Sequence, residues 1–224
     1  MQKCNICKEN CFNKILESNN DFFKEENHRT IQFKKGETLV KQGSFVTHII
    51  FLTKGIVKMV MEGTNGKNII SSFQISGNFL CLSSIYCNDS FPYTIKAINN
   101  ATVCMIRKDA IINLQKRNFE IDKMILNWYI QEYNEMYKKL QTYGTKNMPG
   151  RLADAILYFS QERFQRESIF SFLSRKDIAE FAAMSLESMM KYLTEFKNDK
   201  LISIKGKDLI INNISLLERL SRVS

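Results

Sequence analysis

The chain has 224 residues, a mass of 26.1 kDa and a formal net charge of +9. No apolar run approaches the roughly 20 residues that a membrane-spanning helix needs, and the opening MQKCNICKENC lacks the apolar core of an export signal. We therefore expect a cytoplasmic protein of two small domains, with reduced cysteines, an anionic partner and no membrane contact.

Residues 30–107 are predicted to form a succession of short strands. The segment is rich in β-branched and aromatic residues and carries six of the nine glycines of the chain. Short strands separated by glycine turns are typical of a closed or sandwiched β architecture. We expect a β domain that occupies residues 1–118.

The hydrophobic period changes after Arg107, where a long helix is predicted over residues 119–143. Apolar residues recur there every three or four positions and form a wide, aromatic stripe with few charges. We predict that this stripe forms a dimer interface with a second copy; the alternative is that it packs only on its own β domain. The predicted interface residues are Ile121, Ile125, Trp128, Tyr129, Tyr133, Met136 and Leu140.

A break in the helical pattern is predicted at residues 144–150, which contain two glycines and one of only two prolines in the chain. We expect a separate domain over residues 144–224. It begins with a single helix predicted over 151–165 and ends with two short strands that meet at Gly206.

Residues 174–191 have the pattern of a helix-turn-helix. Ser174 and Ser185 are each placed to cap a helix, and Ala183 and Met184 lie between the two helices. The second helix of such a motif enters the major groove by its N-terminal end. In the hairpin that follows, lysines flank Gly206, which is the arrangement of a wing that reaches the phosphate backbone.

These features predict a surface for double-stranded DNA. Glu187 can accept a hydrogen bond from cytosine, and Lys191 can donate one to guanine. A two-fold dimer implies a pseudo-palindromic site with half-sites about one helical turn apart. The predicted DNA-binding residues are Ser174, Arg175, Lys176, Ser185, Leu186, Glu187, Ser188, Met190, Lys191, Lys205 and Lys207.

The chain resembles the Crp/Fnr transcription regulators over essentially its whole length. The resemblance is carried by GETLVKQG at 36–43, by IIFLTKGIVK at 49–58 and by residues 174–191. It implies an α+β fold with a β jelly-roll sensor domain similar to cyclic-nucleotide-binding domains, a dimerisation helix and a winged helix-turn-helix. It also implies RNA polymerase as a partner.

Two positions of the predicted reading helix depart from the family. Lys191 stands where the family has a base-reading arginine, and lysine lacks the planar fork of arginine. Met190 stands where the Fnr branch has serine, whereas Glu187 matches the base-reading glutamate of the family. We therefore expect a DNA consensus that differs from the familiar one.

The sequence predicts no enzymatic activity and no cyclic nucleotide. It contains no HExxH pattern, no glycine-rich phosphate loop and no recognisable catalytic triad. The cyclic-AMP branch holds the phosphate with arginine, but Lys96 is the only cation in residues 77–98. A metabolite-binding module without DNA binding is the rival to a regulator.

Three cysteines near the N-terminus raise the question of a metal site. Fnr-type oxygen sensors hold a four-iron cluster with three N-terminal cysteines and one distant cysteine in the β domain. The resemblance implies that Cys4, Cys7, Cys11 and Cys104 hold a 4Fe-4S cluster that senses oxygen or redox state. The spacing of Cys7 and Cys11 is tighter than in the Fnr pattern.

Other interpretations of these cysteines stay open. The same four thiolates would satisfy zinc or act as a thiol redox sensor. Cys4, Cys7, Cys11 and Ile15 also share one helical face and would form an apolar stripe. Cys87 is an alternative fourth ligand. A regulator without a cluster would respond to a small-molecule effector or to haem in the β domain.

Overall fold

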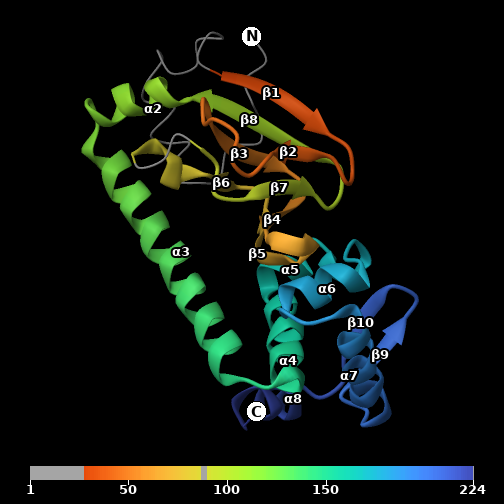
Figure 1. The fold of residues 1–224 in the computed structure, drawn as a ribbon. Helices are drawn as coiled ribbons and strands as arrows, with labels where there is room; N and C mark the ends of the chain where they lie inside the picture. Colours follow the sequence, from red (N-terminus) through yellow and green to blue (C-terminus); the bar gives the residue numbers. More distant parts are fainter. Residues whose placement is uncertain (1–27, 87–89, 224) are drawn as a thin grey trace. The chain divides into compact units, whose positions relative to one another are not determined.

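The computed structural model describes residues 28–86 and 90–223 (Figure 1). The chain divides into two compact units. The first comprises residues 1–59 and 73–134, and the second comprises residues 60–72 and 135–224. Among the residues described, no helix is both long and apolar enough to cross a membrane.

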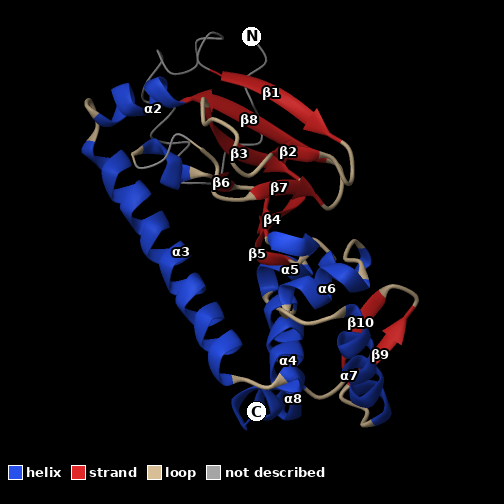
Figure 2. Ribbon diagram, viewed as in Figure 1, coloured by secondary structure: helices blue, strands red, loops and turns tan. Residues whose placement is uncertain are grey.

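The N-terminal half is built from two four-stranded sheets, drawn in red in Figure 2. The first has the order β1 (His28–Phe33), β8 (Ala101–Arg107), β3 (His48–Lys54), β6 (Asn78–Leu80), and the second has the order β2 (Thr38–Val40), β7 (Thr94–Ala97), β4 (Ile56–Glu62), β5 (Asn68–Ile75). In the first sheet, β3 pairs antiparallel with both β6 and β8. Apolar side chains of both sheets form one core, which includes Ile50, Leu52, Val57, Ile95 and Val103.

The turn between β3 and β4 requires glycine. Gly55 has φ +96°, and a Cβ at this position would lie 2.6 Å from the carbonyl oxygen of Asn100 and 2.8 Å from the Cα of Ala101. The Asn99 side-chain oxygen accepts a hydrogen bond from the Ile56 amide at 2.7 Å. The strand pair that carries the family resemblance therefore closes around a backbone contact that excludes any side chain.

The rest of the described chain is mostly helical. The helices are α2 (Lys108–Gln115), α3 (Phe119–Thr145), α4 (Met148–Phe159), α5 (Glu162–Gln165), α6 (Arg175–Phe181), α7 (Leu186–Asn198) and α8 (Ile214–Val223). A hairpin of β9 (Ile202–Lys205) and β10 (Asp208–Ile211) lies between α7 and α8 in the chain. The predicted fold class, α+β with an N-terminal β domain, helices and a C-terminal helix-turn-helix, is confirmed.

The single helix predicted over residues 151–165 is wrong, because α4 ends at Phe159 and α5 begins at Glu162. The Ser160 hydroxyl donates to the carbonyl oxygen of Leu157 at 2.8 Å, and the next residue adopts an extended backbone. The break turns Phe164 back toward the core, where its ring centroid lies 6.2 Å from that of Phe159. On one continuous helix, these two residues would face different sides.

The long helix α3 has two apolar faces, between which the predicted interface residues are divided. Ile121 and Ile125 are 0% and 2% exposed and belong to the core of their own β domain. Trp128 and Tyr129 are partly buried against the same core. The remaining apolar residues form what we call the outer face of α3, and all are at least 49% exposed: Leu126, Ile130, Tyr133, Met136, Tyr137 and Leu140.

Candidate nucleic-acid interface

The first helix of the predicted motif begins with a capping box. The Ser174 hydroxyl accepts a hydrogen bond from the Asp177 amide at 3.1 Å, and the Asp177 carboxylate accepts from the Ser174 amide at 2.8 Å. These reciprocal bonds satisfy two backbone donors that the helix itself cannot. Ile178 and Phe181 are 1% and 6% exposed and hold α6 on the core.

A tight turn separates α6 from α7. Ala183 has φ +51°, which is the left-handed conformation, and the Met184 amide donates to the carbonyl oxygen of Ala179 at 3.0 Å. Ser185 then caps α7, since its hydroxyl accepts from the Ser188 amide at 3.0 Å. Caps and turn therefore fix where the second helix begins.

Arg151 on α4 holds this turn in place. Its guanidinium donates to the carbonyl oxygens of Lys146 and Tyr143, each at 2.9 Å, and to that of Ala183 at 3.4 Å. The Tyr143 hydroxyl donates to the carbonyl oxygen of Phe181 at 2.8 Å. This role could not be predicted from the sequence, because the carbonyl of Ala183 lies 32 residues from Arg151 in the chain.

The two sides of α7 differ sharply in burial. Met189, Leu193 and Phe196 are at most 3% exposed and face the core. On the other side lies what we call the reading face of α7, whose members are all exposed: Leu186, Glu187, Met190 and Lys191. One end of the helix thus presents two apolar side chains, one carboxylate and one ammonium to the outside.

The serines predicted to bind DNA already have partners within the protein. The Ser174 hydroxyl donates to the Asp177 carboxylate at 2.6 Å, and the hydroxyls of Ser185 and Ser188 lie 2.9 Å apart. They remain predicted contacts, but their first role is to cap the two helices. The Lys176 ammonium is 72% exposed and lies 3.7 Å from the Glu180 carboxylate.

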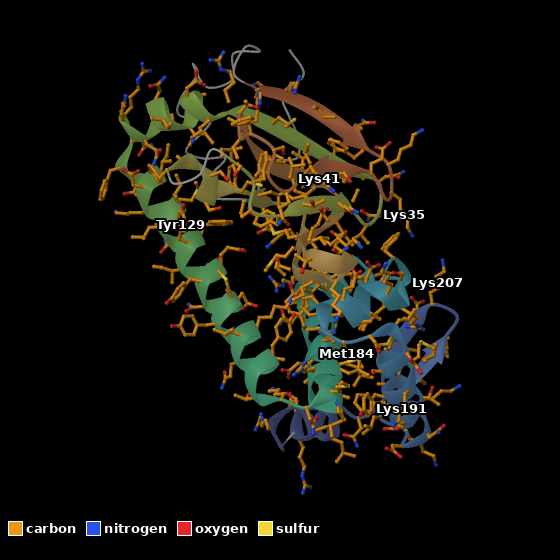
Figure 3. All side chains as sticks on the ribbon, viewed as in Figure 1. Lys35, Lys41, Tyr129, Met184, Lys191 and Lys207 are labelled. Atoms are coloured by element: carbon orange, nitrogen blue, oxygen red, sulfur yellow. The ribbon has the colours of Figure 1, made fainter. Side chains whose placement is uncertain are left out.

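The hairpin after α7 has the form of a wing. Lys205 on β9 pairs with Asp208 on β10, and Gly206 between them has φ +62°. Lys205 and Lys207 are exposed. Figure 3 labels Lys207 on the wing and Lys191 on α7, both on the outside of the ribbon. Two elements therefore carry exposed cations suited to a phosphate backbone.

Of the four predicted cluster ligands, the structure describes Cys104. Cys4, Cys7, Cys11 and the alternative Cys87 lie outside the described residues. Cys104 is half-buried on β8, opposite Thr30 of β1 and Phe51 of β3. The described part of the chain contains no group of three or more His, Cys, Asp or Glu residues that could hold a metal ion.

Cys81 is a poor ligand by comparison. It is fully buried, and burial raises the pKa of its thiol to about 12. A thiol held protonated neither ligates metal nor reacts readily with oxidants, because both need the thiolate. Of the two cysteines that the structure describes, Cys104 is therefore the candidate ligand.

Two family models match this chain. A cyclic nucleotide-binding domain matches residues 30–118, and a Crp-like helix-turn-helix domain matches residues 150–220. The second match contains α6, α7 and the wing.

Similar proteins cover most of the chain. The fumarate and nitrate reduction regulatory protein of Vibrio cholerae is 25% identical over 196 residues, which are 85% of this chain and 78% of the relative. The protein of the same name from Escherichia coli K12 is 23% identical over 84% of this chain and 76% of its own length. FixK2 from Bradyrhizobium japonicum has a TM-score of 0.76 at 15% identity, covering 88% of this chain and 98% of its own.

We predict that Arg151→Lys lowers the free energy of unfolding by about 2 kcal/mol, because lysine cannot reach three carbonyl oxygens with a rigid fork. Arg166→Lys is the matched control: Arg166 pairs with Glu162 at the surface, and its replacement should change stability by less than about 0.5 kcal/mol. Urea denaturation of both variants measures the difference. Equal losses would show that the carbonyl contacts of Arg151 do not stabilise the turn.

Proposed function

The chain belongs to the Crp/Fnr family of DNA-binding transcription regulators, and we propose that it reads a pseudo-palindromic site as a homodimer. Its relatives are regulators and not enzymes. The observation that carries the proposal is the exposed reading face of α7, which follows a capped, tightly turned helix pair and precedes a lysine-tipped wing. Such a helix presents its N-terminal side chains to base edges.

The proposal divides the chain into a sensor domain at 1–118, a dimerisation helix at 119–143 and a DNA-binding domain at 144–224. RNA polymerase is proposed as a further partner from family membership. The outer face of α3 supports the dimer, because contiguous exposed apolar residues on a long helix are unfavourable in water and are buried when a second helix covers them.

We propose that the β domain senses oxygen or redox state through a 4Fe-4S cluster held by Cys4, Cys7, Cys11 and Cys104. The support is twofold: thiolates are the ligands of such clusters, and Cys104 is only half-buried, unlike Cys81. The strand β1 begins 17 residues after Cys11 and pairs with β8, where Thr30 lies opposite Cys104. The cluster would supply sensitivity to oxidants, and the cysteines would hold it at the β domain.

A second candidate is an effector that binds inside the β domain without a cluster. One observation favours it. The Ser84 hydroxyl is fully buried and has no hydrogen-bond partner among the described residues. A buried hydroxyl without a partner is costly, and a ligand could satisfy it.

Glu187→Ala and Lys207→Ala should affect DNA binding in different ways. We expect Glu187→Ala to relax base choice at one position of each half-site, where the wild type prefers one base by about 1–3 kcal/mol. We expect Lys207→Ala to weaken binding to all sequences alike and to lower the salt dependence by about one counterion. Selection from a random DNA library followed by titration at two salt concentrations measures both effects. If both variants lose affinity equally on every sequence, α7 is not the reading helix.

Leu140→Glu should dissociate the dimer. Leu140 is 68% exposed in the described chain, so the substitution leaves the fold intact but places a carboxylate within the proposed apolar interface. Gln131→Glu is the control, since Gln131 is exposed and lies outside the outer face of α3. Sedimentation analysis at micromolar concentration should give a monomer for Leu140→Glu and a dimer for the wild type and the control. A dimer in all three would place the interface elsewhere.

Protein purified without oxygen should be coloured and contain about four iron atoms per chain, and air should bleach it. Cys104→Ser should lose the iron and the colour, whereas Cys81→Ala, which removes a protonated thiol, should keep both. Absorption spectra with iron, sulfide and zinc analysis give the answer. A colourless protein free of iron that still binds DNA would contradict the cluster and leave the effector as the signal.

A further inference from the structure

Two apolar residues on the reading face of α7 have no role in the core. Leu186 is 47% exposed and Met190 is 43% exposed, whereas the opposite side of the helix is anchored by fully buried residues. Single exposed apolar residues are ordinary on protein surfaces. These two are distinctive because they lie one helical turn apart at the end of α7 that would face DNA.

The four residues of the reading face form two pairs of different chemistry, one apolar and one charged. Leu186 and Met190 are four residues apart and lie above one another, and so do Glu187 and Lys191 beside them. An apolar pair therefore runs next to a charged pair. Thr194 follows one turn after Met190, and its hydroxyl donates to the Met190 carbonyl oxygen at 2.9 Å, so this hydroxyl is engaged within the helix.

We propose that Leu186 and Met190 read the C5 methyl groups of thymine in the major groove. This inference rests on the proposed DNA-binding function. Thymine is the one base whose major-groove edge carries an apolar group, and apolar side chains recognise it by contact. Side chains four residues apart on a helix are about 5–6 Å apart, and successive bases on a strand are about 3.4 Å apart along the axis. The half-site therefore holds thymines one or two base steps apart, beside the bases that Glu187 and Lys191 contact.

The same two side chains act against other bases. An amino group of adenine or cytosine placed against Leu186 or Met190 would lose its water without gaining an acceptor. Discrimination therefore comes from the methyl contact and from this penalty together. Serine at position 190, as in the Fnr branch, would not impose that penalty, because a hydroxyl can accept or donate.

The test replaces thymine with deoxyuridine, which removes only the C5 methyl group. A site is first selected with the wild-type protein from a random library, and each thymine is then replaced singly. We expect binding to weaken about threefold to fourfold at two positions of each half-site, the effect of one buried methyl group, and to stay unchanged elsewhere.

Variants connect each position to its side chain. Met190→Ser should make binding indifferent to deoxyuridine at one of the two positions and leave the other sensitive, and Leu186→Ser should do the reverse. Lys205→Ala is the control, since it should weaken binding to the thymine and deoxyuridine sites by the same factor. Thermal unfolding should show all three variants folded, because each substituted side chain is exposed.

Two failures are distinguishable. If the wild type selects a site but no deoxyuridine replacement weakens binding, or if the serine variants keep the full deoxyuridine sensitivity, the methyl contacts are refuted and DNA recognition stands. If the wild type selects no sequence at all, the proposed function is refuted and the methyl contacts with it.

Discussion

The left-handed backbone of Ala183 is the constraint on which the candidate interface depends. A residue with a Cβ is strained at φ +51°, by roughly 1–2 kcal/mol, so its surroundings must stabilise the turn. The turn is stabilised by the hydrogen bond from the Met184 amide to the Ala179 carbonyl oxygen and by the Arg151 guanidinium, which donates to the Ala183 carbonyl oxygen. Since the serine caps begin α6 and α7 on either side of the turn, the direction of α7 is set by hydrogen bonds and not by a flexible loop. A reading face needs that rigidity.

The two faces of α3 explain why its sequence is apolar over so wide an arc. Ile121 and Ile125 complete the core of the β domain, whereas Tyr133 and Leu140 on the outer face are 57% and 68% exposed. A helix that packs on one partner needs only one stripe. Two stripes on one helix are consistent with two partners, the β domain of the same chain and a second chain.

Local and non-local features differed in how well the sequence predicted them. The caps at Ser174 and Ser185 depend on residues within three positions, so the pattern was enough to predict the helix-turn-helix. The break after Phe159 could not be predicted, because it depends on the contact that Phe164 makes once the core has formed. The division of α3 into two faces could not be predicted for the same reason. Ile125 and Leu140 are both apolar, and only the folded chain shows that the first is buried and the second exposed.

Lys139 links α3 to the first helix of the helix-turn-helix. Its ammonium donates to the carbonyl oxygens of Ile70 and Ser71 and lies 3.5 Å from the ring centroid of Phe181 on α6. Burial lowers the pKa of this lysine well below its ordinary value, so the charge depends on those two acceptors and the ring face. The neighbouring Lys138 is 72% exposed and pairs with Glu135 at the surface, so it loses little of its hydration. Any displacement of β5 or of α6 would separate the Lys139 ammonium from these partners. The end of α6 is therefore held on α3 by Lys139 as well as by the hydrogen bonds of Tyr143 and Arg151.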